Sequence, residues 1–78
     1  MDTLQEINEV FRKVFERPDL SVSGNFTTND ISGWDSLTHM TLIAAIEEHF
    51  RITFTFEEIR AFVNVGHMID LINKKTNR

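Results

Sequence analysis

The sequence predicts an all-α bundle of three main helices and one short helix. Apolar residues recur at intervals of three and four in three segments of the chain, which is the helical period. The chain contains no cysteine, so neither a disulfide nor a thiolate zinc site can support the fold. A chain of 78 residues that depends on packing alone folds most easily as a tight helical bundle. We expect residues 1–78 to form one domain.

The first helix is expected to begin at Thr3 and to end by about Glu16. Thr3 and Glu6 have the spacing of a capping box, in which each side chain satisfies a backbone donor. Pro18 disfavours helical geometry at the residue before it, so the helix stops there. One face of this helix is apolar and should pack in the core; it consists of Leu4, Ile7, Val10, Phe11, Val14 and Phe15.

A long connection rich in Ser, Thr, Asn, Asp and Gly runs from Arg17 to Asp35. It exceeds the about 12–15 residues usual for a loop without secondary structure, so we expect it to be fixed to the bundle or functional. Phe26, Ile31 and Trp34 are its candidate anchors. Trp34 could instead be a platform for a ligand, but we favour the role of a packed anchor.

The second helix is expected to run from Ser36 to about Phe50, with Asp35 as its N-cap. It carries two apolar stripes. The first should face the core, with His39 near its middle, and consists of Leu42, Ile43, Ile46 and Phe50. The second consists of Leu37, Met40 and Ala44, flanked by Glu47 and Glu48. A central helix can bury both stripes, but we expect the second to lie at the surface and receive a partner.

Two further helices complete the bundle. After an extended or turn segment, Arg51–Phe54, Thr55 and Glu58 form a second capping-box pair that predicts a short helix through about Phe62. Asn64 can then cap a last helix from Val65 to about Lys75. The inward residues of this last helix should be Val65, Met68, Ile69, Leu71 and Ile72.

Charge and hydropathy exclude several classes of function. The chain has 8 Lys and Arg against 12 Asp and Glu, a net charge of −4, which argues against a nucleic-acid partner. Its acidic first residues do not resemble a signal peptide. The longest apolar run, Leu42–Ile46, is far too short to span a membrane. We therefore expect a cytoplasmic protein, and a monomer, because nothing suggests more than weak self-association.

Ser36 is the candidate functional residue. It occupies the first turn of a helix, where free backbone N–H groups and the positive end of the helix dipole favour a phosphate. A bland alternative is that Asp35 and Ser36 only cap the helix. His39 lies three residues on and could act as a base for the Ser36 hydroxyl, but the sequence around it is not a nucleophile elbow. We expect His39 to pack toward the core, and we expect no catalytic residues and no metal site.

The motif Asp35-Ser36-Leu37 opens a helix that continues to Glu47-Glu48-His49-Phe50 and then Arg51-Ile52-Thr53-Phe54. Together with the chain length and the short acidic helix at Glu57-Glu58, this pattern resembles the acyl carrier proteins over essentially the whole chain. The resemblance implies a four-helix acyl-carrier-type bundle in which Ser36 receives 4′-phosphopantetheine from coenzyme A. The thiol of the arm would hold acyl intermediates as thioesters for fatty-acid, polyketide or specialised-metabolite biosynthesis. The protein would then be no enzyme itself but the substrate of a phosphopantetheinyl transferase.

The resemblance also implies that the second helix is the docking surface for the transferase and for acyl-loading and acyl-processing enzymes. Its candidate recognition residues are Asp35, Leu37, Met40, Thr41, Ala44, Glu47 and Glu48. Relatives often have acidic residues where this chain has Thr38 and Thr41, so apolar contact should matter more here. Two alternatives stay open: a carrier of aminoacyl, peptidyl or D-alanyl groups, and a helical adaptor without a prosthetic group.

The acyl cargo of such a carrier must avoid water. Ala44 and Ala45 are small and predict space near Ile59, Phe62 and Ile69, in a cleft between the second and third helices. The bulky rings of Phe54 and Phe62 could instead fill that space.

Overall fold

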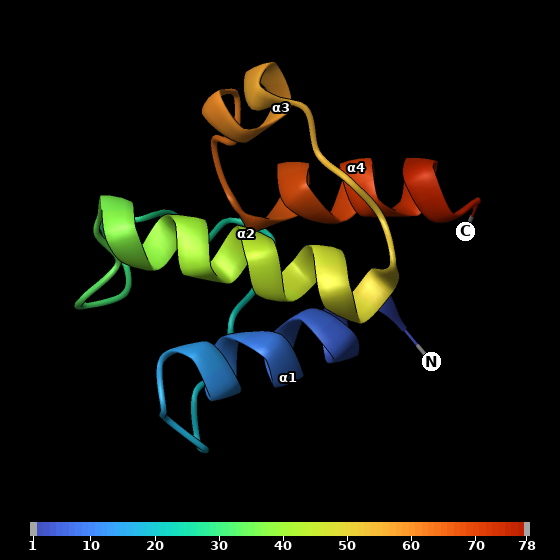
Figure 1. The fold of residues 1–78 in the computed structure, drawn as a ribbon. Coiled ribbons are helices and arrows are strands. Elements are labelled where there is room, and N and C mark those ends of the chain that lie inside the picture. Colours follow the sequence, from blue (N-terminus) through green and yellow to red (C-terminus); the bar gives the residue numbers. More distant parts are fainter. Residues whose placement is uncertain (1, 78) are drawn as a thin grey trace.

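The computed structural model describes residues 2–77, which form four helices and no strand. These helices are α1 (Thr3–Val14), α2 (Ser36–Phe50), α3 (Phe56–Arg60) and α4 (Val65–Thr76). Helices α1 and α2 lie side by side and run in opposite directions, and α4 also packs against α1 (Figure 1). The short α3 lies at the top of the view, above the start of α4. The predicted all-α architecture is confirmed. No helix among residues 2–77 combines the length and the apolar character needed to cross a bilayer.

The core is formed where α1, α2 and α4 meet, and it includes residues from both long connections. Its buried apolar side chains are Ile7, Val10, Phe11, Leu20, Val22, Ile31, Trp34, Leu42, Ile43, Ile46, Phe50, Phe54, Val65, Met68 and Ile72. The predicted inward faces of α1, α2 and α4 all contribute to it. The remaining inward-face residues of α1 and α4 are half-buried at its edge.

The start of α1 differs from the prediction. Asp2, rather than Thr3, is the N-cap, and its side chain accepts a hydrogen bond from the backbone N–H of Leu4 at 3.4 Å. Thr3 is buried, and its hydroxyl donates to Oδ1 of Asn73 on α4 at 2.5 Å, so it joins two helices instead of capping one. The helix ends at Val14, slightly before the expected Glu16, which already has the left-handed φ of 53°.

The long connection between α1 and α2 is fixed to the bundle. Ile31 and Trp34 are buried and Phe26 is half-buried against the core, as predicted. Sequence reasoning missed the buried Asn8 of α1. Its Oδ1 accepts from the backbone N–H of Val22 at 2.6 Å, and its Nδ2 donates to the carbonyl of the same residue at 3.3 Å. One polar side chain therefore replaces the backbone partners that this loop segment lacks.

A second attachment joins the connection to the start of α4. The backbone N–H of Gly66 donates to the carbonyl of Gly24 at 2.6 Å, and that of Val65 donates to the carbonyl of Phe26 at 2.9 Å. A Cβ atom at position 66 would lie 2.9 Å from the Gly24 oxygen. This close backbone approach is the reason why glycine is needed at position 66.

The remaining helix boundaries follow the sequence closely. Helix α2 spans Ser36–Phe50, as predicted, and the chain leaves it at Arg51 with a left-handed φ of 57°. The capping box of Thr55 and Glu58 is present at the start of α3. Helix α3 ends at Arg60 rather than about Phe62, because the next N–H, that of Ala61, bonds to two carbonyls at once and tightens the last turn.

Candidate functional site

The N-terminus of α2 is organised by its cap. Gly33, with a φ of 89°, turns the chain into the helix, and Asp35 is extended. The Asp35 carboxylate accepts a hydrogen bond from the backbone N–H of Thr38 at 2.8 Å. This bond lowers the pKa of Asp35 below its ordinary value of 3.8. The carboxylate is therefore committed to the cap, and the hydroxyl of Ser36, the first helical residue, is exposed to solvent.

Trp34 and His39 pack against each other beside this turn. The buried Trp34 ring packs edge-on against Phe11 at a centroid distance of 5.4 Å. Its Nε1–H donates to Nδ1 of His39 at 3.0 Å, and the His39 ring in turn meets the edge of Phe62. Both expectations, Trp34 as a packed anchor and His39 as a core-side residue, are confirmed.

The same hydrogen bond decides what His39 can do chemically. An indole N–H only donates, so Nδ1 of His39 must be the acceptor. Neutral His39 then carries its proton on Nε2 and has no free ring lone pair to activate the Ser36 hydroxyl. A serine–histidine catalytic pair is not built here. Among residues 2–77, no group of three or more His, Cys, Asp or Glu side chains is placed to hold a metal ion.

A hollow of about 580 Å³ opens beside Ser36, between the start of α2 and α3. It is lined by Thr28, Trp34, Asp35, Ser36, His39, Met40, Phe56, Ile59, Arg60 and Phe62. Its walls are mainly apolar or aromatic. Of these residues, Ile59 and Phe62 are predicted from the sequence, whereas Phe56 and Arg60 are not. The spacing of an aromatic residue and a cation four residues apart on a predicted helix was the available signal.

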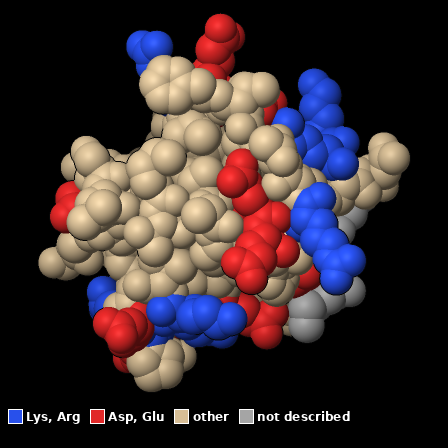
Figure 2. All heavy atoms as spheres, viewed as in Figure 1, with Lys and Arg blue, Asp and Glu red and all other residues tan. Residues whose placement is uncertain are grey.

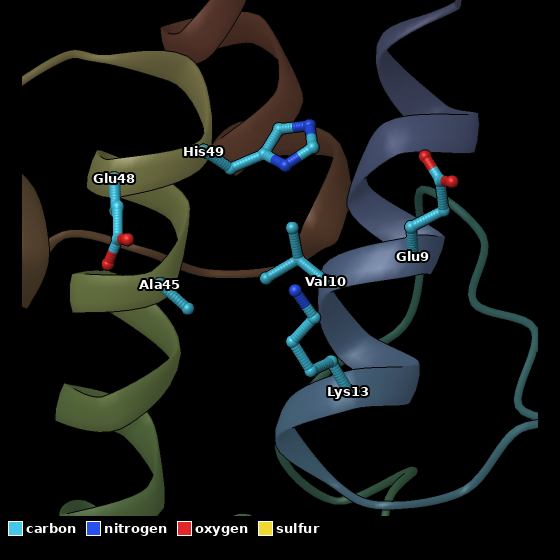
Figure 3. Close-up of a pocket in the computed structure, with 6 residues that line it drawn as sticks. All are labelled: Glu9, Val10, Lys13, Ala45, Glu48 and His49. Carbon is cyan, nitrogen blue, oxygen red and sulfur yellow. The ribbon is translucent and has the colours of Figure 1, made fainter.

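The two alanines do not line this hollow, so that part of the cleft prediction is wrong. Ala44 is exposed, and Ala45 faces a separate groove of about 520 Å³ between α1 and α2. Figure 3 shows this groove, with Glu9 and Lys13 on the α1 side and Glu48 and His49 on the α2 side. The rings of Phe54 and Phe62 are in contact, with a centroid distance of 5.3 Å, and they fill part of the space expected for a deeper cleft.

The predicted second stripe of α2 lies at the surface. Leu37 is 79% exposed, Met40 is 51% exposed, and Ala44 is exposed as well. Thr41 and Glu48 are also exposed. The surface over the N-terminal part of α2 is uncharged, and acidic side chains gather over its C-terminal part (Figure 2).

Glu47 differs from the other candidate recognition residues of α2. It is half-buried, and its Oε2 accepts a hydrogen bond from the backbone N–H of Phe54 at 2.8 Å. This hydrogen bond fixes the connection between α2 and α3, so Glu47 stabilises the structure of the free protein.

Comparison with known proteins shows what the chain is similar to. The family model for the phosphopantetheine attachment site matches residues 5–72, a range that includes Asp35 and Ser36. The fold also matches the solution NMR structure of a holo acyl carrier protein from Geobacter metallireducens, with a TM-score of 0.91 and 40% sequence identity. That match covers 100% of this chain and 90% of the other.

Proposed function

The chain belongs to the phosphopantetheine-bearing acyl carrier proteins, and from this premise we propose that the Ser36 hydroxyl is the attachment point of its 4′-phosphopantetheine arm. The protein is a carrier and not a catalyst. In the proposed reaction the Ser36 oxygen attacks the phosphorus of coenzyme A that bears the pantetheine, and a phosphodiester bond forms as the pyrophosphate bond breaks. Adenosine 3′,5′-bisphosphate leaves. When bound, the arm supplies a terminal thiol that can hold an acyl group as a thioester.

One observation carries the proposal: Ser36 is an exposed serine at the first position of a helix inside the family match. The other serines of the chain, Ser21, Ser23 and Ser32, lie in the connection between α1 and α2 and not in a helix. The positive end of α2 favours the negative charge of a phosphodiester. The Asp35 carboxylate accepts its hydrogen bond from the backbone N–H of Thr38, so it leaves the Ser36 hydroxyl accessible to an enzyme.

The proton on Ser36 must go to the partner enzyme. Neutral His39 offers no free ring lone pair, and the Asp35 carboxylate has a lowered pKa, which makes it a poor base. A phosphopantetheinyl transferase that modifies Ser36 therefore has to supply the general base itself. The Ser36 hydroxyl is therefore expected to be unreactive until a transferase binds.

We propose that partner enzymes dock on the exposed face of α2. The first turn of this helix contains no acidic residue, and its exposed apolar residues Leu37 and Met40 flank Ser36. Apolar contact should supply binding energy near the arm, while Asp35, Thr41, Ala44 and Glu48 line the rest of the surface. The net charge of −4 would add electrostatic steering toward basic partners.

For the biological role, we propose a cytoplasmic carrier, formed by residues 1–78 as one domain, that serves fatty-acid, polyketide or specialised-metabolite biosynthesis. Attachment of the cargo to the arm keeps its effective concentration high near each partner enzyme. An aminoacyl or peptidyl cargo is the alternative outcome, and it would be recognised by the mass of the loaded protein.

Intact-mass measurement tests the attachment. The wild-type protein is incubated with coenzyme A and a broad-range phosphopantetheinyl transferase, beside Ser36→Ala and the matched control Ser32→Ala. We expect one added arm on the wild type and on the control, and none on Ser36→Ala. An arm on Ser36→Ala, or a wild type that gains no mass with several transferases, would overturn the proposal and favour an adaptor without a prosthetic group.

A further inference from the structure

The charge of the hollow beside Ser36 comes from two side chains. Two of its lining residues carry a full charge, Asp35 and Arg60. The Asp35 carboxylate is already paired with the backbone N–H of Thr38. The guanidinium of Arg60 is therefore the charge that remains available to a ligand in this hollow.

Arg60 is held at the edge of the hollow by an aromatic neighbour. Its guanidinium carbon lies 5.7 Å from the ring centroid of Phe56, one turn earlier on α3, in cation–π geometry. Both side chains are exposed at the surface and both line the hollow. A cation–π contact does not use up the N–H donors of a guanidinium, so these donors can still meet an anion.

Neither ion pair of residues 2–77 uses this guanidinium. One joins His49 to Glu6 and the other joins Lys75 to Glu58. Arg60 differs in this respect from Lys75, the basic side chain that approaches α3 from α4.

We propose that Arg60 binds the phosphodiester that joins the arm to Ser36, an inference that rests on the attachment proposed above. A phosphodiester carries one negative charge and two non-bridging oxygens, which match the planar fork of N–H donors of a guanidinium. In this arrangement the arm rests along the hollow between α2 and α3 when no partner is bound.

The contact between Arg60 and the phosphodiester is expected to be weak, because both groups are exposed to solvent. An ion pair between exposed groups changes a population by no more than about fivefold, because water and salt screen it. A hold of this size biases the arm toward the hollow and still lets a partner enzyme withdraw it. Arg60 is thus a positioning residue for the arm, and Phe56 positions Arg60.

The test is ³¹P NMR of the modified protein. Wild type, Arg60→Gln, Arg60→Lys and the control Lys74→Gln, an exposed basic residue of α4, are each loaded with the arm, and intact mass shows that loading succeeded. The same samples unfolded in urea give the ³¹P shift of an unbound phosphodiester. We expect the folded wild type and Lys74→Gln to share a line displaced from the unfolded position. The Arg60→Gln line should move toward the unfolded position, and the Arg60→Lys line should lie between.

A second measurement uses the wild type alone. Raising the salt concentration to about 1 M, where the screening length is about 3 Å, should move its ³¹P line toward the unfolded position. This experiment holds even if an Arg60 variant folds poorly, which fluorescence of the single tryptophan, Trp34, would reveal.

The outcomes separate the two proposals. A wild type that gains no arm overturns attachment at Ser36, and the role of Arg60 with it. A loaded wild type whose ³¹P line coincides with that of Arg60→Gln, or does not respond to salt, overturns the role of Arg60 and leaves the attachment intact.

Discussion

Replacing Asn8 by alanine tests how the loop that leads to α2 is held. Asn8 is 8% exposed, and its side chain hydrogen bonds to both backbone polar groups of Val22, which is 3% exposed. Alanine would leave a buried N–H and a buried carbonyl without their partner. Each such group costs about 1–3 kcal/mol, so the upper bound is about 6 kcal/mol. Because the loop can open and hydrate both groups, we expect the free energy of unfolding to fall by about 2–3 kcal/mol.

Urea unfolding followed by Trp34 fluorescence measures this loss. For a small protein the free energy of unfolding falls by about 1 kcal/mol per M of urea, so the midpoint of Asn8→Ala should drop by about 2–3 M. The exposed loop residue Asn29 provides a matched control, and Asn29→Ala should stay within about 0.5 kcal/mol of the wild type. Coincident midpoints for the two alanine variants would refute the reasoning.

Three further predictions concern α3, α4 and the docking face. The backbone N–H of Thr55 and the neighbouring Lys75 lower the pKa of Glu58 below 4.5. Ionised Glu58 therefore stabilises the fold above that pH, and this stabilisation is lost as the pH falls through the lower pKa of the folded state. Glu58→Gln should therefore lose less stability than the wild type on acidification below pH 4.5, and equal losses would contradict this. Gly66→Ala brings a Cβ atom within 2.9 Å of the Gly24 oxygen, so we expect it to cost about 1–3 kcal/mol, visible as a lower melting temperature; an unchanged melt would disprove the clash. Met40→Ala should lower kcat/KM of the phosphopantetheinyl transferase about fivefold without changing the unfolding curve, since it truncates an exposed apolar contact beside Ser36. An unaltered kcat/KM would argue against docking on this face.

The sequence predicts the helices well where local signals agree. Asp35 caps α2 and the apolar spacing continues to Phe50, so both bounds of α2 follow from the chain alone. The capping box of α3 is equally local. The cap of α1 was misassigned because Thr3 is recruited by Asn73, a residue 70 positions away, and no local pattern carries that contact.

Some features of the candidate site also follow from local sequence, whereas others depend on how the helices pack. The exposure of Ser36 follows from its place at the first turn of α2, which the motif predicts. The hollow beside it depends on where α3 lies against α2, so Phe56 and Arg60 could be assigned to it only from the fold. The alanines of α2 were misplaced because the rotation of α2 between α1 and α3 is set by packing, which turns Ala45 toward α1.

We propose that the arm is joined to the Ser36 oxygen, and the protein isolated from its own host can be examined for this bond. Fragmentation of its peptides by tandem mass spectrometry locates the modification and registers any cargo with it. We expect phosphopantetheine on Ser36. An unmodified Ser36, or an arm on Ser32 or another residue, would contradict it.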